Sequence, residues 1–191
     1  MDEKQILQEK RYLLPYHFLD LYSDEHKLLH HVPYIYRIEK ALGLGQEGDA
    51  IDVGCGDGRL IYEGQKNKKY KKFIGLDYSE DAISFAKIIN KKASFYKKDL
   101  TNGNSISDIG KFKNIFCLET LEHIQINKID IFLNNCSDLI DDNGIAIFSV
   151  PSSYYPCEEK HYQHFSKNSL NDLLNRYFNV IEITGLENQE G

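Results

Sequence analysis

Short apolar runs alternate along this chain with segments in which apolar residues recur at helical spacing. The runs end at polar or glycine-containing segments, and they are Ile51–Val53, Lys72–Asp77, Ala93–Leu100, Asn114–Leu118, Ile145–Val150 and Asn179–Thr184. Runs of this length between turn residues predict buried strands. The segments between them predict amphipathic helices that start near Arg59, Ser79, Ile126 and Ser166.

The alternation of strand and helix patterns predicts the class of the fold. Such units are right-handed βαβ crossovers, which place the strands parallel in one sheet with helices on both faces. We therefore expect an α/β fold with a doubly wound, mostly parallel sheet. Two local signals refine the pattern: Ser79 is a good N-cap residue, and Asp141–Gly144 reads as a turn before the fifth run.

The first 46 residues have a different pattern. The segment Tyr12–Tyr22 is rich in aromatic residues, and Glu25–Leu44 carries apolar residues at helical spacing, with Pro33 inside it. We expect a helical N-terminal cap or arm, residues 1–46, followed by the α/β domain, residues 47–191. The cap either covers the site and contacts the substrate, with Tyr16 and His17 as polar tips, or packs against the sheet as an arm.

Composition narrows the function classes. The net charge of −6 argues against a protein that holds nucleic acid over a wide surface. The four cysteines form no C-x-x-C pair, which favours reduced thiols in a cytoplasmic protein over a disulfide framework. No apolar run approaches the roughly 20 residues of a membrane span.

A glycine-rich stretch follows the first predicted strand. Gly54, Gly56 and Gly58 stand at alternate positions, directly before a helix-capable segment. Such a turn lets a ligand approach the backbone and the free N–H groups of the helix N-terminus. The G-x-G-x-G spacing differs from the G-x-G-x-x-G of dinucleotide folds, which disfavours a nicotinamide oxidoreductase.

Acidic residues stand at the ends of three predicted strands. Asp52 precedes the first glycine, and Asp77 and Asp99 close the next two runs. Ligands of open α/β sheets bind at the carboxyl ends of the strands. The three acids are therefore candidates for one site beside the glycine loop.

The glycine loop and the acids that follow it resemble the class I S-adenosylmethionine-dependent methyltransferases, over roughly residues 48–186. The resemblance implies S-adenosylmethionine as cofactor, with its methionine part on the glycine loop. It further implies that Asp77 takes the ribose hydroxyls, that Tyr78 lies against the adenine, and that Asp99 with Leu100 reads the adenine edge. The remaining cofactor contacts that it implies are Asp52, Gly54, Cys55, Gly56, Gly58, Leu118 and Glu119.

Two further segments resemble motifs of the small-molecule and ubiquinone-pathway methyltransferases. They are Leu118–His123, after the fourth predicted strand, and His161–Ser166. His123 is our candidate general base, because an imidazole suits proton removal from a hydroxyl acceptor. Glu119, His161 and His164 are further catalytic candidates, and Tyr154 is a candidate substrate contact.

The same residues allow a metal site. If the turn that holds Glu119, Glu122 and His123 is helical, the three share one face, and His161 or His164 could complete the set. A very similar constellation binds a divalent metal in the small-RNA 3′-end 2′-O-methyltransferases, whereas the same pattern occurs in relatives that need no metal. A third reading is that these groups only hydrogen-bond to one another. We expect no metal.

We therefore expect methyl transfer to a small molecule, at a hydroxyl of a sugar, a quinol or a similar metabolite. A metal-dependent RNA 2′-O-methyltransferase and a catalytically silent methyltransferase-like binding subunit are the alternatives. The family's sheet usually ends with an antiparallel hairpin, so we expect its final strand to be missing, truncated or supplied by another chain. An uncovered sheet edge would favour a homodimer.

Overall fold

The sheet of this protein has five strands, and every neighbouring pair is parallel. The computed structural model describes residues 1–21, 25–103 and 106–185, with the backbone alone for residues 25–31. The spatial order of the strands is β3-β2-β1-β4-β5. Their bounds are β1 (Gly48–Val53), β2 (Tyr70–Asp77), β3 (Ser94–Lys97), β4 (Phe112–Leu118) and β5 (Ile140–Ser149). The expected Rossmann-like α/β fold is confirmed.

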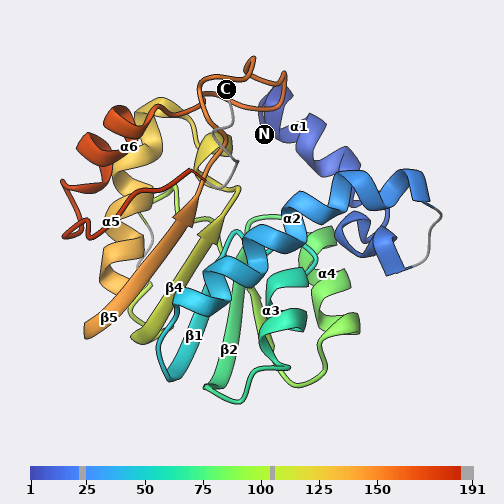
Figure 1. The fold of residues 1–191 in the computed structure, drawn as a ribbon, viewed down its shortest axis with the longest axis horizontal. Helices are drawn as coiled ribbons and strands as arrows, with labels where there is room; N and C mark the ends of the chain where they lie inside the picture. The colour runs from blue at the N-terminus through green and yellow to red at the C-terminus, as the bar shows by residue number, and fades with distance from the viewer. Residues whose placement is uncertain (22–24, 104–105, 186–191) are drawn as a thin grey trace.

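Helices cover both faces of the sheet (Figure 1). One face carries α2 (Glu25–Leu44), α3 (Arg59–Gly64) and α4 (Glu80–Ile89), and the other carries α5 (Ile129–Leu139) and α6 (Lys167–Leu174). Successive residues of a strand point to opposite faces. In β1, Ile51 and Val53 accordingly belong to the core under α5 and α6, whereas Ala50 belongs to the core under α2, α3 and α4.

Serine side chains cap the first turns of α4 and α6, near the helix starts that the sequence predicts. The Ser79 hydroxyl accepts a hydrogen bond from the Ala82 N–H at 3.1 Å, and Ser166 caps α6 in the same way through Ser169. A capping oxygen satisfies one of the N–H groups that the first helical turn leaves free. Local side-chain chemistry therefore fixes where α4 and α6 begin.

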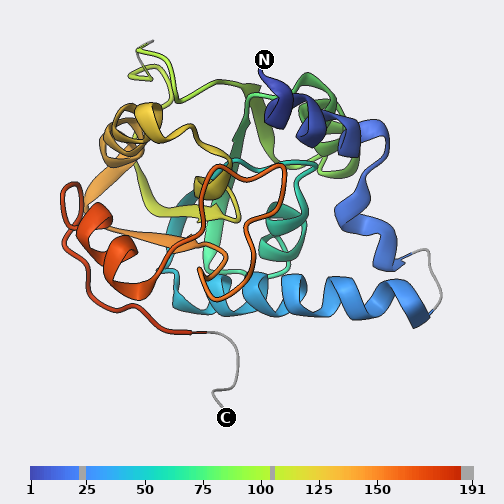
Figure 2. The same cartoon turned by 90° about the horizontal axis from the view of Figure 1, so that it is seen from above.

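The N-terminal residues form a short helical segment above the carboxyl ends of the strands. It consists of α1 (Glu3–Glu9) and two 3₁₀ helices, η1 (Lys10–Leu13) and η2 (Tyr16–Leu21). Figure 2 shows α1 beside the orange segment that follows β5. The Lys4 ammonium joins the two by donating to the carbonyl oxygens of Glu159 and His161, at 2.7 and 2.6 Å. The segment thus lies at the edge of the sheet where ligands of this fold class bind.

The prediction of a sixth strand at Asn179–Thr184 is wrong. This segment pairs with no strand among the described residues. Val180 and Ile183 pack partly buried against the core, whereas Ile181 is exposed. The apolar run that suggested a strand therefore reflects packing of two side chains against the core, without a hydrogen-bonded partner strand.

The predicted turn at Asp141–Gly144 lies inside β5. The strand begins at Ile140, opposite Phe112, and the register then shifts so that Ile145 stands opposite Asn114. The four residues bulge out of the ladder instead of preceding it. A bulge of this kind adds chain on one strand while the pairing continues on both sides.

All four cysteine side chains are free thiols in the structure. Cys55, Cys117 and Cys136 are buried, and Cys157 is exposed. Among the described residues, no helix is long and apolar enough to cross a membrane.

Candidate active site

The glycine loop between β1 and α3 has a backbone that only glycine adopts without strain. The φ angles of Gly54, Gly56 and Gly58 are 77°, 53° and 86°, all in the left-handed region. A Cβ atom on Gly54 would lie 2.3 Å from Thr120 Oγ1, and one on Gly56 would lie 2.9 Å from the Tyr12 hydroxyl. The loop is therefore packed closely from both the β4 side and the N-terminal side.

Asp77 lies at the end of β2, beside this loop. Its carboxylate is buried, and it accepts hydrogen bonds from the N–H groups of Gly56 and Ser79, both at 2.9 Å. Burial raises the pKa of this carboxyl to about 6. Each carboxylate oxygen still has a lone pair for a further donor. Asp77 can thus receive the two hydroxyls of a diol.

Asp52, near the end of β1, differs from Asp77 in the protonation of its carboxyl group. Burial, with the charge of Asp77 nearby, raises its pKa to about 8. The group is therefore mostly protonated at neutral pH. The structure places Asp52 behind the loop, in the sheet.

A cavity opens in front of the loop, with about 750 Å³ of space including open solvent. The predicted site residues that line it are Gly54, Asp77, Tyr78, Asp99, Leu100, Glu119 and His123. Sequence reasoning missed several others, and they include Gln5, Gln8, Tyr12, Gln125, Lys128 and Phe132.

The other predicted residues do not line this cavity. Those assigned to the cofactor are Asp52, Cys55, Gly56, Gly58 and Leu118, and those assigned to substrate or catalysis are Tyr16, His17, Tyr154, His161 and His164. The Tyr154 side chain is 95% exposed and so makes no wall of a pocket. Cys55 belongs to the glycine loop, and its side chain is buried in the core under α2, α3 and α4.

The end of β4 carries backbone strain. Glu119 has a φ of +50°, the one positive value among the described residues other than glycine. Its Oε1 accepts from the Ser149 hydroxyl at 2.8 Å, and the Arg37 guanidinium lies 3.7 Å away. Holding a residue other than glycine in this backbone conformation costs about 1–3 kcal/mol of folding free energy, and such strain is concentrated at functional sites. No sequence signal indicates it.

Glu122, His123 and His161 form a compact cluster next to Glu119. One potential ligand atom from each lies within 4.8 Å of the others, so the three could hold a divalent ion. Leu121–His123 is a 3₁₀ turn, and Glu119 lies outside it and outside the cluster. The condition for a shared helical face is therefore not met, because the helical turn does not include Glu119.

Burial sets the protonation of this cluster. It lowers the pKa of His123 to about 3, with help from His161 and Lys160, and lowers that of His161 to about 4. Burial, with the nearby charge of Glu119, raises the pKa of Glu122. The His161 Nδ1 lies 2.8 Å from His164 Nε2. The buried His161 and the partly buried His123 are thus neutral at ordinary pH and can accept a proton.

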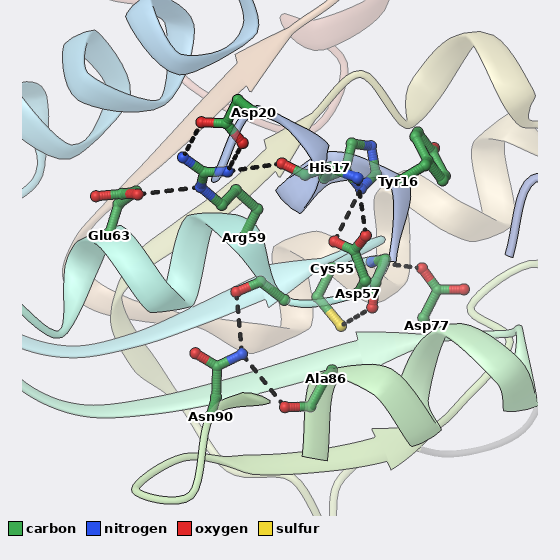
Figure 3. Close-up of polar contacts among 12 residues, drawn as sticks. Tyr16, His17, Asp20, Cys55, Asp57, Arg59, Glu63, Asp77, Ala86 and Asn90 are labelled. Atoms are coloured by element: carbon green, nitrogen blue, oxygen red, sulfur yellow. Dashed lines mark hydrogen bonds and ion pairs between the residues drawn. The ribbon is translucent and has the colours of Figure 1, made fainter. Parts of the chain in front are cut away.

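Asp57 of the glycine loop and Arg59, the first residue of α3, hold the N-terminal segment (Figure 3). The fully buried Asp57 accepts from the His17 N–H at 3.0 Å and contacts His17 Nδ1 at 2.9 Å. Arg59 donates to the His17 carbonyl at 2.7 Å and to both oxygens of Asp20 at 2.5 and 2.8 Å. The structure therefore places His17 against the loop.

The sequence is similar to those of known methyltransferases. Residues 45–185 match the model of a methyltransferase domain. The chain is 32% identical to the mitochondrial ubiquinone biosynthesis O-methyltransferase of Saccharomyces cerevisiae over 115 residues, which cover 59% of this chain and 36% of that protein. It is 31% identical to the ubiquinone biosynthesis O-methyltransferase of Pelagibacter ubique over 103 residues, or 52% and 40% of the two chains. The matches thus span less than half of these relatives.

Solved structures show the same fold. The magnesium protoporphyrin IX methyltransferase of Synechocystis PCC 6803 with bound S-adenosylmethionine superimposes with a TM-score of 0.70 at 18% identity, over 97% of this chain and 90% of that one. The small RNA methyltransferase HEN1 gives a TM-score of 0.64 at 19% identity, over 74% and 21%. The family model covers the glycine loop, Asp77 and the strained turn after β4, and the sheet has the matching fold. The chain therefore belongs to the class I S-adenosylmethionine-dependent methyltransferases.

Proposed function

We propose that this protein transfers a methyl group from S-adenosylmethionine to a hydroxyl of a small molecule, such as a sugar or a quinol. One observation carries the proposal: a single cavity joins the glycine loop and Asp77 to Glu119 and His123. The cofactor residues and the candidate base would then face the same space. The ubiquinone O-methyltransferases among the relatives support a hydroxyl acceptor.

The residues present fit the cofactor. The glycine loop leaves no room for a Cβ atom at Gly54, and the Asp77 carboxylate keeps lone pairs for two ribose hydroxyls. Asp99 and Leu100 line the cavity beyond Asp77, where the adenine would lie. When bound, S-adenosylmethionine supplies a sulfonium methyl for in-line displacement.

The protein's part is to align the acceptor, exclude water and take up a proton. The His123 imidazole is neutral above about pH 3, so it is ready to accept. Its low pKa is sufficient because a hydroxyl becomes strongly acidic while its oxygen gains a methyl group. His123 Nε2 lies 3.9 Å from Glu122 Oε1, so the carboxyl of Glu122 is next to the nitrogen atom that would carry the proton.

The direct test is formation of S-adenosylhomocysteine in the presence of S-adenosylmethionine and a panel of nucleotide sugars, catechols and quinols. The proposal expects turnover with a member of this hydroxyl panel and a product methylated at oxygen. An amine panel serves as the comparison. Turnover with amines alone would contradict the assignment to oxygen.

A second function is favoured by the cluster of Glu122, His123 and His161: metal-dependent 2′-O-methylation of RNA. The three groups are close enough for one divalent ion, and a small RNA methyltransferase has a similar fold. The net charge of −6 disfavours an RNA ligand.

Chelation separates the two functions. We expect the activity to survive dialysis against a chelator. Loss of activity on chelation, restored by Mn²⁺ or Zn²⁺, would place the RNA function first. Titration of the protein with each metal, measured calorimetrically, gives an independent readout.

A further inference from the structure

We propose that Gln8, on α1, is a cofactor-binding residue whose side-chain Oε1 accepts a hydrogen bond from bound S-adenosylmethionine. The inference rests on the proposed function, since it assumes that the cofactor occupies the cavity at the glycine loop. It adds a contact from the N-terminal segment, which lies outside the motifs of the glycine loop and of the strand ends.

The first observation is position. The Gln8 side chain is buried, with 9% of the residue exposed, although it belongs to a short helix at the surface. It lines the same cavity as Gly54 and Asp77. Gln5 and Tyr12, one helical turn to either side, line it too. This face of the N-terminal segment is thus a wall of the cofactor cavity.

The second observation is an unpaired acceptor. The Gln8 Oε1 is buried and has no hydrogen-bond partner in the part of the chain that the structure describes. The amide nitrogen Nε2 donates to the Tyr16 hydroxyl at 3.5 Å, which leaves the oxygen as the free end. Buried acceptors are nearly always paired, so an orphaned one at a ligand cavity indicates a donor on the ligand.

The third observation is that other contacts hold α1 in place. Asp2 caps the helix, and the Lys4 ammonium binds the segment after β5. At the other end, Glu9 Oε2 accepts from the Ser79 hydroxyl at 3.0 Å. Gln8 itself is not needed for any of these contacts. Its position is therefore set by its neighbours, and its free oxygen has no structural role of its own.

The flanking contacts indicate which part of the cofactor Gln8 would meet. Glu9 contacts Ser79, two residues from Asp77, where the ribose would lie. The Tyr12 hydroxyl lies over Gly56, where the methionine part would lie. Gln8 directly precedes Glu9 and lies one helical turn before Tyr12 on the same wall of the cavity, whereas the adenine would lie at Asp99, beyond Asp77. The donor is therefore a ribose hydroxyl or the ammonium group.

Calorimetric titration with S-adenosylhomocysteine tests the inference. Gln8→Met removes the acceptor at similar volume, and we expect it to weaken binding by roughly 5- to 100-fold, the range for one lost hydrogen bond to a neutral or charged donor. Gln8→Glu keeps an acceptor oxygen and should bind within about threefold of the wild type. Gln65→Met, at an exposed glutamine after α3, is the matched control and should bind like the wild type.

Thermal unfolding gives a second readout. Because Gln8→Met removes an unpaired buried acceptor, the ligand-free variant should unfold at the same or a higher temperature than the wild type. The stabilisation by S-adenosylhomocysteine should be smaller. Repeating the titration with 5′-methylthioadenosine, which lacks the amino-acid part, assigns the donor: a loss there points to the ribose, and a loss with S-adenosylhomocysteine alone points to the ammonium.

Three results would overturn the inference. They are equal affinity of the wild type and Gln8→Met, equal losses in Gln8→Met and Gln8→Glu, and an equal loss in the Gln65→Met control. If the wild type itself fails to bind S-adenosylhomocysteine, the proposed function fails instead.

Discussion

Single side chains at the strand ends account for how the cavity would recognise its cofactor, and Asp77 makes that recognition depend on pH. Its carboxylate accepts hydroxyl hydrogen bonds best when ionised, and its pKa in the free protein is about 6. Affinity for S-adenosylhomocysteine should therefore fall as the pH decreases from 8 through 6 to 5. Titrations across this range check the prediction. In Asp77→Asn the affinity should be lower and the pH dependence near 6 should disappear; a wild-type affinity that is constant from pH 8 to 5 would refute it.

His123 tests the proposed proton transfer. His123→Ala should lower turnover by about 10²–10⁴-fold, the usual contribution of a general base. Because the pKa of His123 is about 3, wild-type turnover should show no acid limb near pH 6.5 that is due to this residue. Steady-state rates and a titration with S-adenosylhomocysteine, which should be unaffected, check both points. Near-normal turnover in His123→Ala would move the role to His161 or His164.

Part of the site was predictable from the residues alone. The glycines and Asp77 follow from local chain requirements, namely positive φ angles and a carboxylate at a strand end. Gln8 and the His17–Asp57 contact were not predictable as contacts, because each joins the N-terminal segment to residues about 40 or more positions away. A sequence pattern carries no signal for such distances. The strain at Glu119 is likewise visible only in the backbone.

At the level of elements, polar contacts with the glycine loop, with Ser79 and with the segment after β5 hold the N-terminal segment, which belongs to neither hydrophobic cluster. Removal of residues 2–21 should therefore leave the sheet folded, since both hydrophobic clusters are built from later residues. It should weaken binding of S-adenosylhomocysteine and of the acceptor, because it removes the Gln8 and Tyr12 wall of the cavity. Circular dichroism and calorimetry measure the two effects.

A milder variant controls for that truncation. Arg59 is 3% exposed and binds Asp20 through two nitrogens, so Asp20→Asn should loosen the segment without removing any wall of the cavity. We expect an affinity between those of the wild type and the truncated protein. Truncated protein that binds S-adenosylhomocysteine as tightly as the wild type would contradict the role of the segment.

The strand predictions are correct where an apolar run of the sequence also has a neighbouring strand with which it pairs. The central strands β1, β2 and β4 have partners on both sides, so their apolar runs report real ladders. Asn179–Thr184 is also an apolar run, but it has no partner strand among the described residues. At Asp141–Gly144 the turn residues are real, yet β4 pairs with the chain on both sides of them. Pairing is a property of two segments, so one segment cannot predict it.

For the whole molecule, the buried acids predict how stability depends on pH. Asp52 has a pKa of about 8 in the folded protein, against 3.8 for an exposed carboxyl. The folded state thus binds more protons, and the free energy of unfolding should fall as the pH rises through this window. His123 and His161 act oppositely below about pH 6.5, because their folded-state pKa values are lowered to about 3 and 4.

Above pH 6.5 the histidines no longer oppose the contribution of Asp52, and Glu122, whose pKa is also raised, acts in the same direction as Asp52. The free energy of unfolding should therefore decrease between pH 6.5 and 8, by up to about 1.4 kcal/mol per pH unit for each proton that the folded state retains. Urea unfolding at several pH values measures the slope. Asp52→Asn should reduce the slope, whereas the control variant Asp49→Asn should retain it; a wild-type slope of zero would contradict the assignment.

The proposed function requires that S-adenosylmethionine binds in the cavity between the glycine loop and Asp77. Calorimetric titration of the ligand-free protein with S-adenosylhomocysteine at pH 8 measures this binding. We expect saturable binding at one site, weakened by about 1–3 kcal/mol in Asp77→Ala, the range for a charged hydrogen bond left unmade. Absence of binding by the wild type at millimolar ligand, or equal affinity in Asp77→Ala, would contradict it.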